Sequence, residues 1–187
     1  KLADKYGVGT VQIYMQQMLN YSERRMRAAL STIPDGTYEF EDVIEGDGID
    51  DDLHAIRVSI RAKGDTIRLD FSGTDDAVRG PLNCRMPSVA ACVYYALKAI
   101  LDPDLPANAG AYRPVEIITR EGSMLSATYP EAVCNANIIT TQRIVDIIVG
   151  AFSQAMPDQV LAASSGTMNL LNVGGLDPRT GKYFQYI

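Results

Sequence analysis

The spacing of apolar residues predicts three long helices. From the start of the chain to Leu30, apolar side chains recur at steps of three and four residues, the period of one helix face. A second such face runs from Pro87 to Ile100, and proline suits the first turn of a helix. A third helix, about Ile138 to Ala155, is apolar on most of its circumference and must be buried.

The first helix face is rich in methionine. We interpret this face as ordinary core packing, with an adaptable binding surface as the alternative, since methionine serves both. The residues that define the face are Val8, Val11, Met15, Met18, Ser22, Met26 and Ala29.

Alternation of apolar and polar residues predicts strands between these helices. The segments 54–62 and 67–71 alternate on either side of a Lys-Gly-Asp turn, which is a hairpin signal. We therefore predict an α+β fold, in which antiparallel hairpins and a mixed sheet pack against about three long helices. The other predicted strands are 37–44, 115–119, 167–173 and 182–187.

Composition limits the class of protein. The chain has 187 residues, of which 47% are hydrophobic, enough for one sizeable core without an internal linker. A net charge of −6 argues against nucleic-acid binding, and no apolar run of about 18 residues predicts a membrane span. Three widely spaced cysteines indicate free thiols and a reducing, cytoplasmic setting. Because the chain begins inside a predicted helix and ends inside a predicted strand, we expect an internal region, residues 1–187, of a longer polypeptide.

Several kinds of chemistry are disfavoured by what the sequence lacks. The single histidine, His54, lies on an apolar strand face, so neither a Ser-His-Asp triad nor a histidine-based metal site is expected. There is no Gly-rich phosphate loop, so ATP binding by this chain alone is not supported. The acidic loop 46–52 could hold a hard cation, but a solvated turn is the favoured interpretation because the ligand order of an EF-hand is missing.

The most distinctive stretch runs from Asp70 to Asn83, where a strand ends in a polar loop that leads into a helix. Loops on a rigid scaffold often carry function, and arginine forks and amides suit an anionic or carbonyl-rich ligand. We expect this loop and other polar connectors to face a common hollow. They supply Asp75, Asp76, Arg79, Asn83, Asn108, Arg113, Asn135, Asn137, Thr141, Gln142 and Arg143.

Each of these residues also has a purely structural interpretation. Asp70 could pair across strands with Arg57 or Arg61, and Arg79 could hold its own acidic loop together. Asn108 could cap or turn the chain, and Asn137 could cap the third helix. Arg143 could pair with Asp146 three residues later.

The stretch from Asp70 to Asn83 closely resembles the signature of the hydantoinase B / oxoprolinase / acetone carboxylase subunit family. The resemblance covers essentially the whole chain with matching spacing. It continues through Tyr94–Lys98, Leu101–Pro106, Asn108–Gly110, Tyr112–Pro114, Thr141–Asp146 and Gly166–Asn169.

This resemblance implies a B-type component of an ATP-dependent enzyme that opens hydantoins or 5-oxoproline. A hydantoinase A-type partner subunit would bind ATP and activate the substrate carbonyl by phosphorylation, giving a hetero-oligomer. The divalent metal of the family is expected outside this region, because its ligand stretch lies upstream. Within this interpretation we predict Arg79, Asp70 and Asp75 as catalytic residues, and Asn83, Asn108, Arg113, Asn137, Thr141 and Arg143 as substrate-binding residues.

Two departures from the commonest family pattern leave other interpretations open. Members often have cysteine where Ala111 stands, and a Gly-Gly-Asn-Val-Glu-Thr-like run where residues 135–140 stand. Both stretches are predicted to lie in site loops, which leaves room for an acetone or acetophenone carboxylase. A further alternative is a scaffold and interface region, with the chemistry located upstream.

Overall fold

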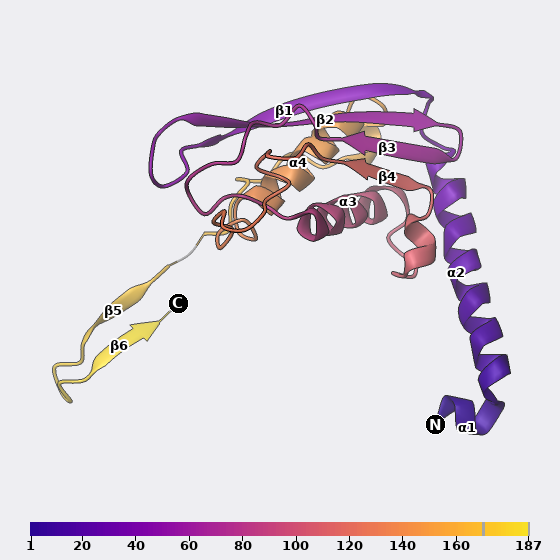
Figure 1. Ribbon diagram of the computed structural model, residues 1–187, viewed down its shortest axis with the longest axis horizontal. Helices are drawn as coiled ribbons and strands as arrows, with labels where there is room; N and C mark the ends of the chain where they lie inside the picture. Colours follow the sequence, from indigo (N-terminus) through magenta and orange to yellow (C-terminus); the bar gives the residue numbers. More distant parts are fainter. Residues whose placement is uncertain (170, 187) are drawn as a thin grey trace.

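The computed structural model describes residues 1–169 and 171–186, and it confirms an α+β fold. Figure 1 shows helices beneath one face of a curved sheet, with two segments that extend away from this body. The elements, in order, are α1 (Leu2–Tyr6), α2 (Val8–Leu30), β1 (Gly36–Glu45), β2 (Leu53–Lys63), β3 (Thr66–Asp70), α3 (Met86–Leu101), the 3-10 helix η1 (Ala109–Tyr112), β4 (Val115–Ile118), α4 (Thr140–Phe152), the 3-10 helix η2 (Pro157–Gln159), β5 (Val173–Leu176) and β6 (Tyr183–Tyr186).

The main sheet has the strand order β1-β2-β3-β4. The β1/β2 and β2/β3 pairs are antiparallel, as the hairpin signal predicts, whereas β3 and β4 are parallel. A parallel pair needs a long crossover, and α3 supplies it by packing under the sheet (Figure 1). The sheet is therefore mixed.

The core lies between the sheet and helices α3 and α4. Strand alternation buries every second residue of β2 from Ile56 to Ala62 and of β3 from Ile67 to Leu69, so that one face packs on the helices and the other carries charges. Helix α3 presents its predicted apolar face to this core. Fully buried side chains at the centre include Ile56, Ile60, Leu69, Phe71, Val89, Val93, Leu97, Ile144, Ile147 and Phe152.

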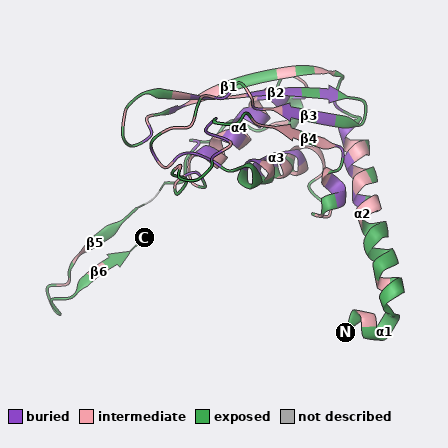
Figure 2. Ribbon diagram, viewed as in Figure 1, coloured by how far each residue is buried: buried purple, intermediate pink, exposed green. Residues whose placement is uncertain are grey.

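Helix α2 forms where predicted, but its first half lies outside the core. The helix is interrupted at Gly7, whose φ of 82° ends α1, and α2 then runs from Val8 to Leu30. Only Ser22, Met26 and Leu30 near its C-terminal end are buried. Met15 and Met18 are 64% and 53% exposed, so the core interpretation is wrong for this half. The cause is geometric: α2 extends well past the sheet, and only its last turns meet neighbours (Figure 2).

The C-terminal hairpin is shorter than predicted. Strands β5 and β6 pair antiparallel around residues 177–181, and both are largely exposed (Figure 2). Of the described residues in the predicted strand 167–173, only Val173 belongs to β5. Leu170 and Ile187, which belong to the two predicted strands, lie outside the described residues.

Two further predictions concern cysteines and membranes. Cys84, Cys92 and Cys134 are all free, as expected, and burial raises the pKa values of Cys84 and Cys92 to about 11 and about 12. Among the described residues, no helix combines the length and hydropathy needed to cross a bilayer.

Candidate functional site

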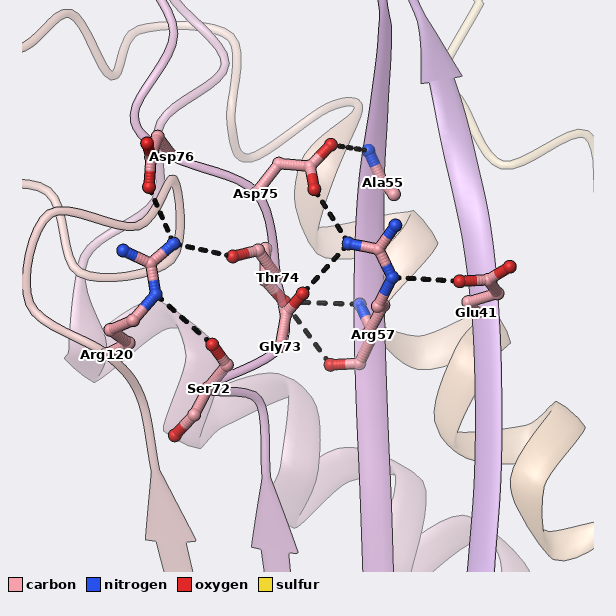
Figure 3. A network of polar contacts seen from close by, with 9 residues as sticks. All are labelled: Glu41, Ala55, Arg57, Ser72, Gly73, Thr74, Asp75, Asp76 and Arg120. Carbon is pink, nitrogen blue, oxygen red and sulfur yellow. Dashed lines mark hydrogen bonds and ion pairs between the residues drawn. The ribbon is translucent and has the colours of Figure 1, made fainter.

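The loop that follows β3 is held from one side by an arginine of β2. Arg57 lies on the charged face of the sheet and donates to the carboxylate of Asp75 at 2.7 Å and to that of Glu41 at 2.9 Å. The same guanidinium donates to the carbonyl of Gly73 at 2.9 Å (Figure 3). Three acceptors on two segments thus fix where the loop leaves the sheet.

A second arginine holds the loop from the other side. Arg120, just after β4, donates to Asp76 and to the carbonyl of Thr74 at 2.7 and 2.9 Å. Its Nε donates to the carbonyl of Ser72 at 3.2 Å (Figure 3). Arg57 and Arg120, and not Arg79, therefore hold the loop after β3 in place. Sequence reasoning missed both, because only the fold brings them to this loop.

Asp75 is kept ionised by its neighbours. Burial pushes its pKa up, but the backbone N–H of Ala55, at 2.7 Å, and the guanidinium of Arg57 outweigh this effect. The pKa of Asp75 is therefore lower than usual, while the same ion pair raises the pKa of Arg57. A carboxylate in this state suits positioning and electrostatic work rather than proton donation near neutral pH.

Beside this clamp lies a hollow of about 320 Å³. Arg79 is exposed at its rim, and among the described residues its side chain takes no part in the ion pairs that fix the loop. An unengaged guanidinium next to a fixed loop can bind an anion or a polarised carbonyl. The lining residues are Asp47, Asp50, His54, Asp75, Asp76, Ala77, Val78 and Arg79.

Asn83 lies beneath this loop and is fully buried. Its amide nitrogen donates to the carbonyls of Val78, Gly80 and Ala132, and its oxygen accepts the N–H of Val78. Because both donors and the acceptor are engaged, Asn83 positions the turn that carries Arg79 and does not face the hollow.

Asp70 is placed on the charged face of the sheet, where it lines a separate hollow of about 620 Å³. Its carboxylate accepts the N–H of Ser72 at 2.9 Å and pairs with Arg68 at 3.2 Å. The alternative of a cross-strand pair with Arg57 or Arg61 is not formed, because Arg57 is engaged by Glu41 and Asp75 while Asp70 pairs with Arg68.

Asn108 and Arg113 lie at the other end of α3, against α2. The oxygen of Asn108 accepts the N–H of Gly110, which confirms its capping role, and its nitrogen donates to Ser22 at 2.7 Å. Arg113 pairs with Glu23 at 2.8 Å. Both residues tie η1 to α2.

Asn137, Thr141 and Arg143 lie around the start of α4. Asn137 is exposed and is not the cap; Ile139 occupies that position, without a side-chain hydrogen bond. Arg143 does not pair with Asp146. It reaches across to Asp42 of β1 instead, because α4 packs on that strand.

Thr141 lines a third hollow, a groove of about 700 Å³ between α3 and α4. Its hydroxyl donates to the carbonyl of Asn137 at 2.9 Å. The predicted site residues therefore fall into four groups, and the expectation of one shared hollow is wrong for the described residues. Of the predicted catalytic residues, only Asp75 and Arg79 line the same hollow, whereas Asp70 lines another.

The departure from the family pattern at Ala111 does not affect the hollow of about 320 Å³ that Arg79 lines. Ala111 is fully buried within η1 and does not line that hollow. The run from Asn135 lies closer, because the N–H of Asn135 donates to the carbonyl of Pro81 at 2.9 Å.

Comparison with known proteins gives consistent matches along the whole chain. The family model described as Hydantoinase B/oxoprolinase matches residues 1–187. The B component of a putative D-/L-hydantoinase from Pseudomonas sp. is 30% identical over 201 aligned positions, which cover 100% of this chain and 33% of that protein.

Two solved structures share the fold. The ATP-dependent caprolactamase from Pseudomonas jessenii has a TM-score of 0.83 and 25% identity, covering 98% of this chain and 32% of its own. A nucleotide-free acetone carboxylase has a TM-score of 0.85 at 15% identity, covering 98% and 26%, and shows the fold alone. The chain spans about a third or less of the relatives that it matches. It belongs to the hydantoinase B/oxoprolinase family.

Proposed function

We propose that this chain is part of the B-type subunit of an ATP-dependent enzyme that opens a cyclic amide. The observation that carries the proposal is the family match over all 187 residues. The likeness to a caprolactamase supports it, because a lactam is a cyclic amide and the shared region covers 98% of this chain.

A partner subunit would bind ATP and phosphorylate the carbonyl oxygen, as the resemblance implies. The hydantoinase relative is named as one component of a multi-subunit enzyme, which supports a hetero-oligomer. ATP as co-substrate supports a cytoplasmic location. The divalent metal of the family would be held by residues outside this region.

In this proposal Arg79 is the residue that contacts the activated substrate. Its guanidinium is exposed at the rim of the hollow, where it would bind the phosphorylated carbonyl or the carboxylate of the opened ring. Asp75, anchored by Arg57, would orient the polar loop toward the substrate. Asn83 would act as a positioning residue beneath Arg79.

Asp70, Asn108, Arg113, Asn137, Thr141 and Arg143 line other surfaces. Their direct involvement in the same reaction would require that segments outside this region bring the surfaces together. We therefore give them structural or partner-contact roles. This distribution is also what supports the scaffold alternative for most of the region.

The carboxylase alternative has one specific support, the fold shared with acetone carboxylase. A pocket that accepts a phosphorylated lactam could equally accept a phosphorylated enol, since both present an anionic phosphoryl group. The departure at Ala111 no longer favours this alternative, because that residue is buried away from the hollow.

The test uses the full-length protein with its ATP-binding partner. We expect ADP formation to accompany ring opening of one of hydantoin, 5-oxoproline or caprolactam, without added bicarbonate. Omission of either component should abolish both products. Ketone consumption that depends on bicarbonate would contradict the hydrolase and establish the carboxylase.

A further inference from the structure

The acidic loop between β1 and β2 converges on the single histidine. One ligand atom each of Asp47, Asp50 and His54 lies within 4.8 Å of the others. Two ligands of one ion cannot be farther apart than twice the metal–ligand distance, which is about 4–5 Å. The three side chains can therefore reach a common ion with little movement.

His54 points to this use. Its Nε2 is buried and, among the described residues, has no hydrogen-bond partner. The nearest carboxylate oxygen, Oδ1 of Asp50, is 3.6 Å away, too far for a hydrogen bond. A buried ring nitrogen without a partner is costly, and a metal ion beside it would remove the cost.

Asp47 is held as a rigid, ionised ligand. It is 2% exposed, and its carboxylate accepts backbone N–H groups from Ile49, Asp50 and Gly80. Burial raises its pKa, but these three donors outweigh burial and keep the pKa below its ordinary value. Fixed orientation of a ligand by outer hydrogen bonds is typical of metal sites, and one lone-pair direction stays free.

We propose that Asp47, Asp50 and His54 form a site for a divalent transition-metal ion such as Mn²⁺ or Zn²⁺. Two carboxylate ligands and one imidazole suit these ions better than Mg²⁺ or Ca²⁺, which prefer oxygen alone. Water from the adjoining hollow of about 320 Å³ would complete the coordination. The sequence analysis weighed a hard cation in the loop 46–52 but favoured a solvated turn, and it did not include His54, because a lone histidine on a strand does not resemble a metal motif.

The ion would connect three segments. Asp47 already binds the N–H of Gly80, in the loop that carries Arg79, and His54 lies at the start of β2. A metal at this position would stiffen the acidic loop against the loop after β3. The proposal stands on these contacts and does not depend on the cyclic-amide activity.

The test compares metal binding by four forms of the full-length protein: wild type, Asp50→Asn, His54→Gln and the control Asp51→Asn. Asp50→Asn is isosteric at a partly exposed position, and Asp51 is an exposed neighbour outside the cluster. Each metal-free protein is titrated with Mn²⁺ and with Zn²⁺ by calorimetry, and circular dichroism checks the fold.

We expect wild type and Asp51→Asn to bind one more ion than the two cluster variants, or to bind it at least tenfold more tightly. Any metal site elsewhere in the protein contributes equally to all four forms and cancels. Identical stoichiometry and affinity in all four forms would overturn the proposal. If Asp50→Asn does not fold, His54→Gln against Asp51→Asn decides in the same way.

Discussion

At the scale of single residues, the loop after β3 is stabilised by partners that are distant in sequence. Alternation along the strands correctly predicts that Asp70 lies on the polar face, since that requires only local periodicity. The choice of partner depends on strand register and on the position of β4, which local patterns do not encode. Sequence reasoning therefore missed Arg57 and Arg120 as the residues that hold the loop after β3. It also missed Asp42 as the partner of Arg143.

Replacement of Asn83 tests the proposed support beneath Arg79. Asn83→Ala removes the side-chain partner of the Val78 N–H and of three carbonyls, of which that of Gly80 is buried and the others are partly buried. We expect the free energy of unfolding of the intact protein to fall by about 2–3 kcal/mol, measured in urea. Asn137→Ala, at an exposed position, should change it by less than about 0.5 kcal/mol. Equal effects of the two variants would contradict the support role.

The lowered pKa values of three carboxylates predict that the stability of the fold depends on pH. For Asp47, Asp70 and Asp75, burial raises the pKa, but hydrogen bonds and nearby cations lower it by a larger amount. Each folded pKa therefore lies below its ordinary value. Between the folded and ordinary values the unfolded chain binds more protons, so stability falls as pH decreases below about 4 and is level above about 5. Unfolding in urea from pH 3 to pH 6 measures this slope, which should be shallower for Asp75→Asn. An unchanged slope in that variant would contradict the account of the Arg57–Asp75 pair.

At the scale of elements, local signals predict the helices and the central hairpins well. Proline near the start of α3, strict alternation in β2 and β3, and the turn between them each require only neighbouring residues. The burial of α2 could not be read from its apolar face, because burial depends on what lies opposite. Only the last turns of α2 contact η1 and the sheet.

The contact between α2 and η1 is close enough to test with a single methyl group. A Cβ on Gly110 would lie 2.0 Å from the carbonyl oxygen of Leu19, so Gly110→Ala must force the two elements apart. We expect a loss of about 1–3 kcal/mol in the free energy of unfolding. Gly9→Ala, in an open stretch of α2 with no atom within 4 Å, should instead stabilise by about 0.5–1 kcal/mol. The same sign for both variants would contradict this packing.

At the scale of the whole molecule, the predicted site residues are split among four places. One reason is simple: Asn83 precedes α3 and Asn108 follows it, and a helix of 16 residues separates its ends by about 24 Å. The predicted element order already implied this separation. What the sequence could not predict is that the N-terminal half of α2 and the hairpin β5–β6 extend away from the core (Figure 1).

The most direct test of the proposed site is coupled turnover by the complete complex carrying Arg79→Ala. Arg24→Ala, at another exposed arginine, on α2, serves as the matched control. We predict that kcat/KM for ring opening falls on the order of 100-fold in Arg79→Ala, because a group that binds the activated carbonyl is lost. ATP binding and the melting temperature should stay unchanged, and Arg24→Ala should behave as wild type. Wild-type turnover with unchanged substrate affinity in Arg79→Ala would contradict the site and favour the scaffold alternative.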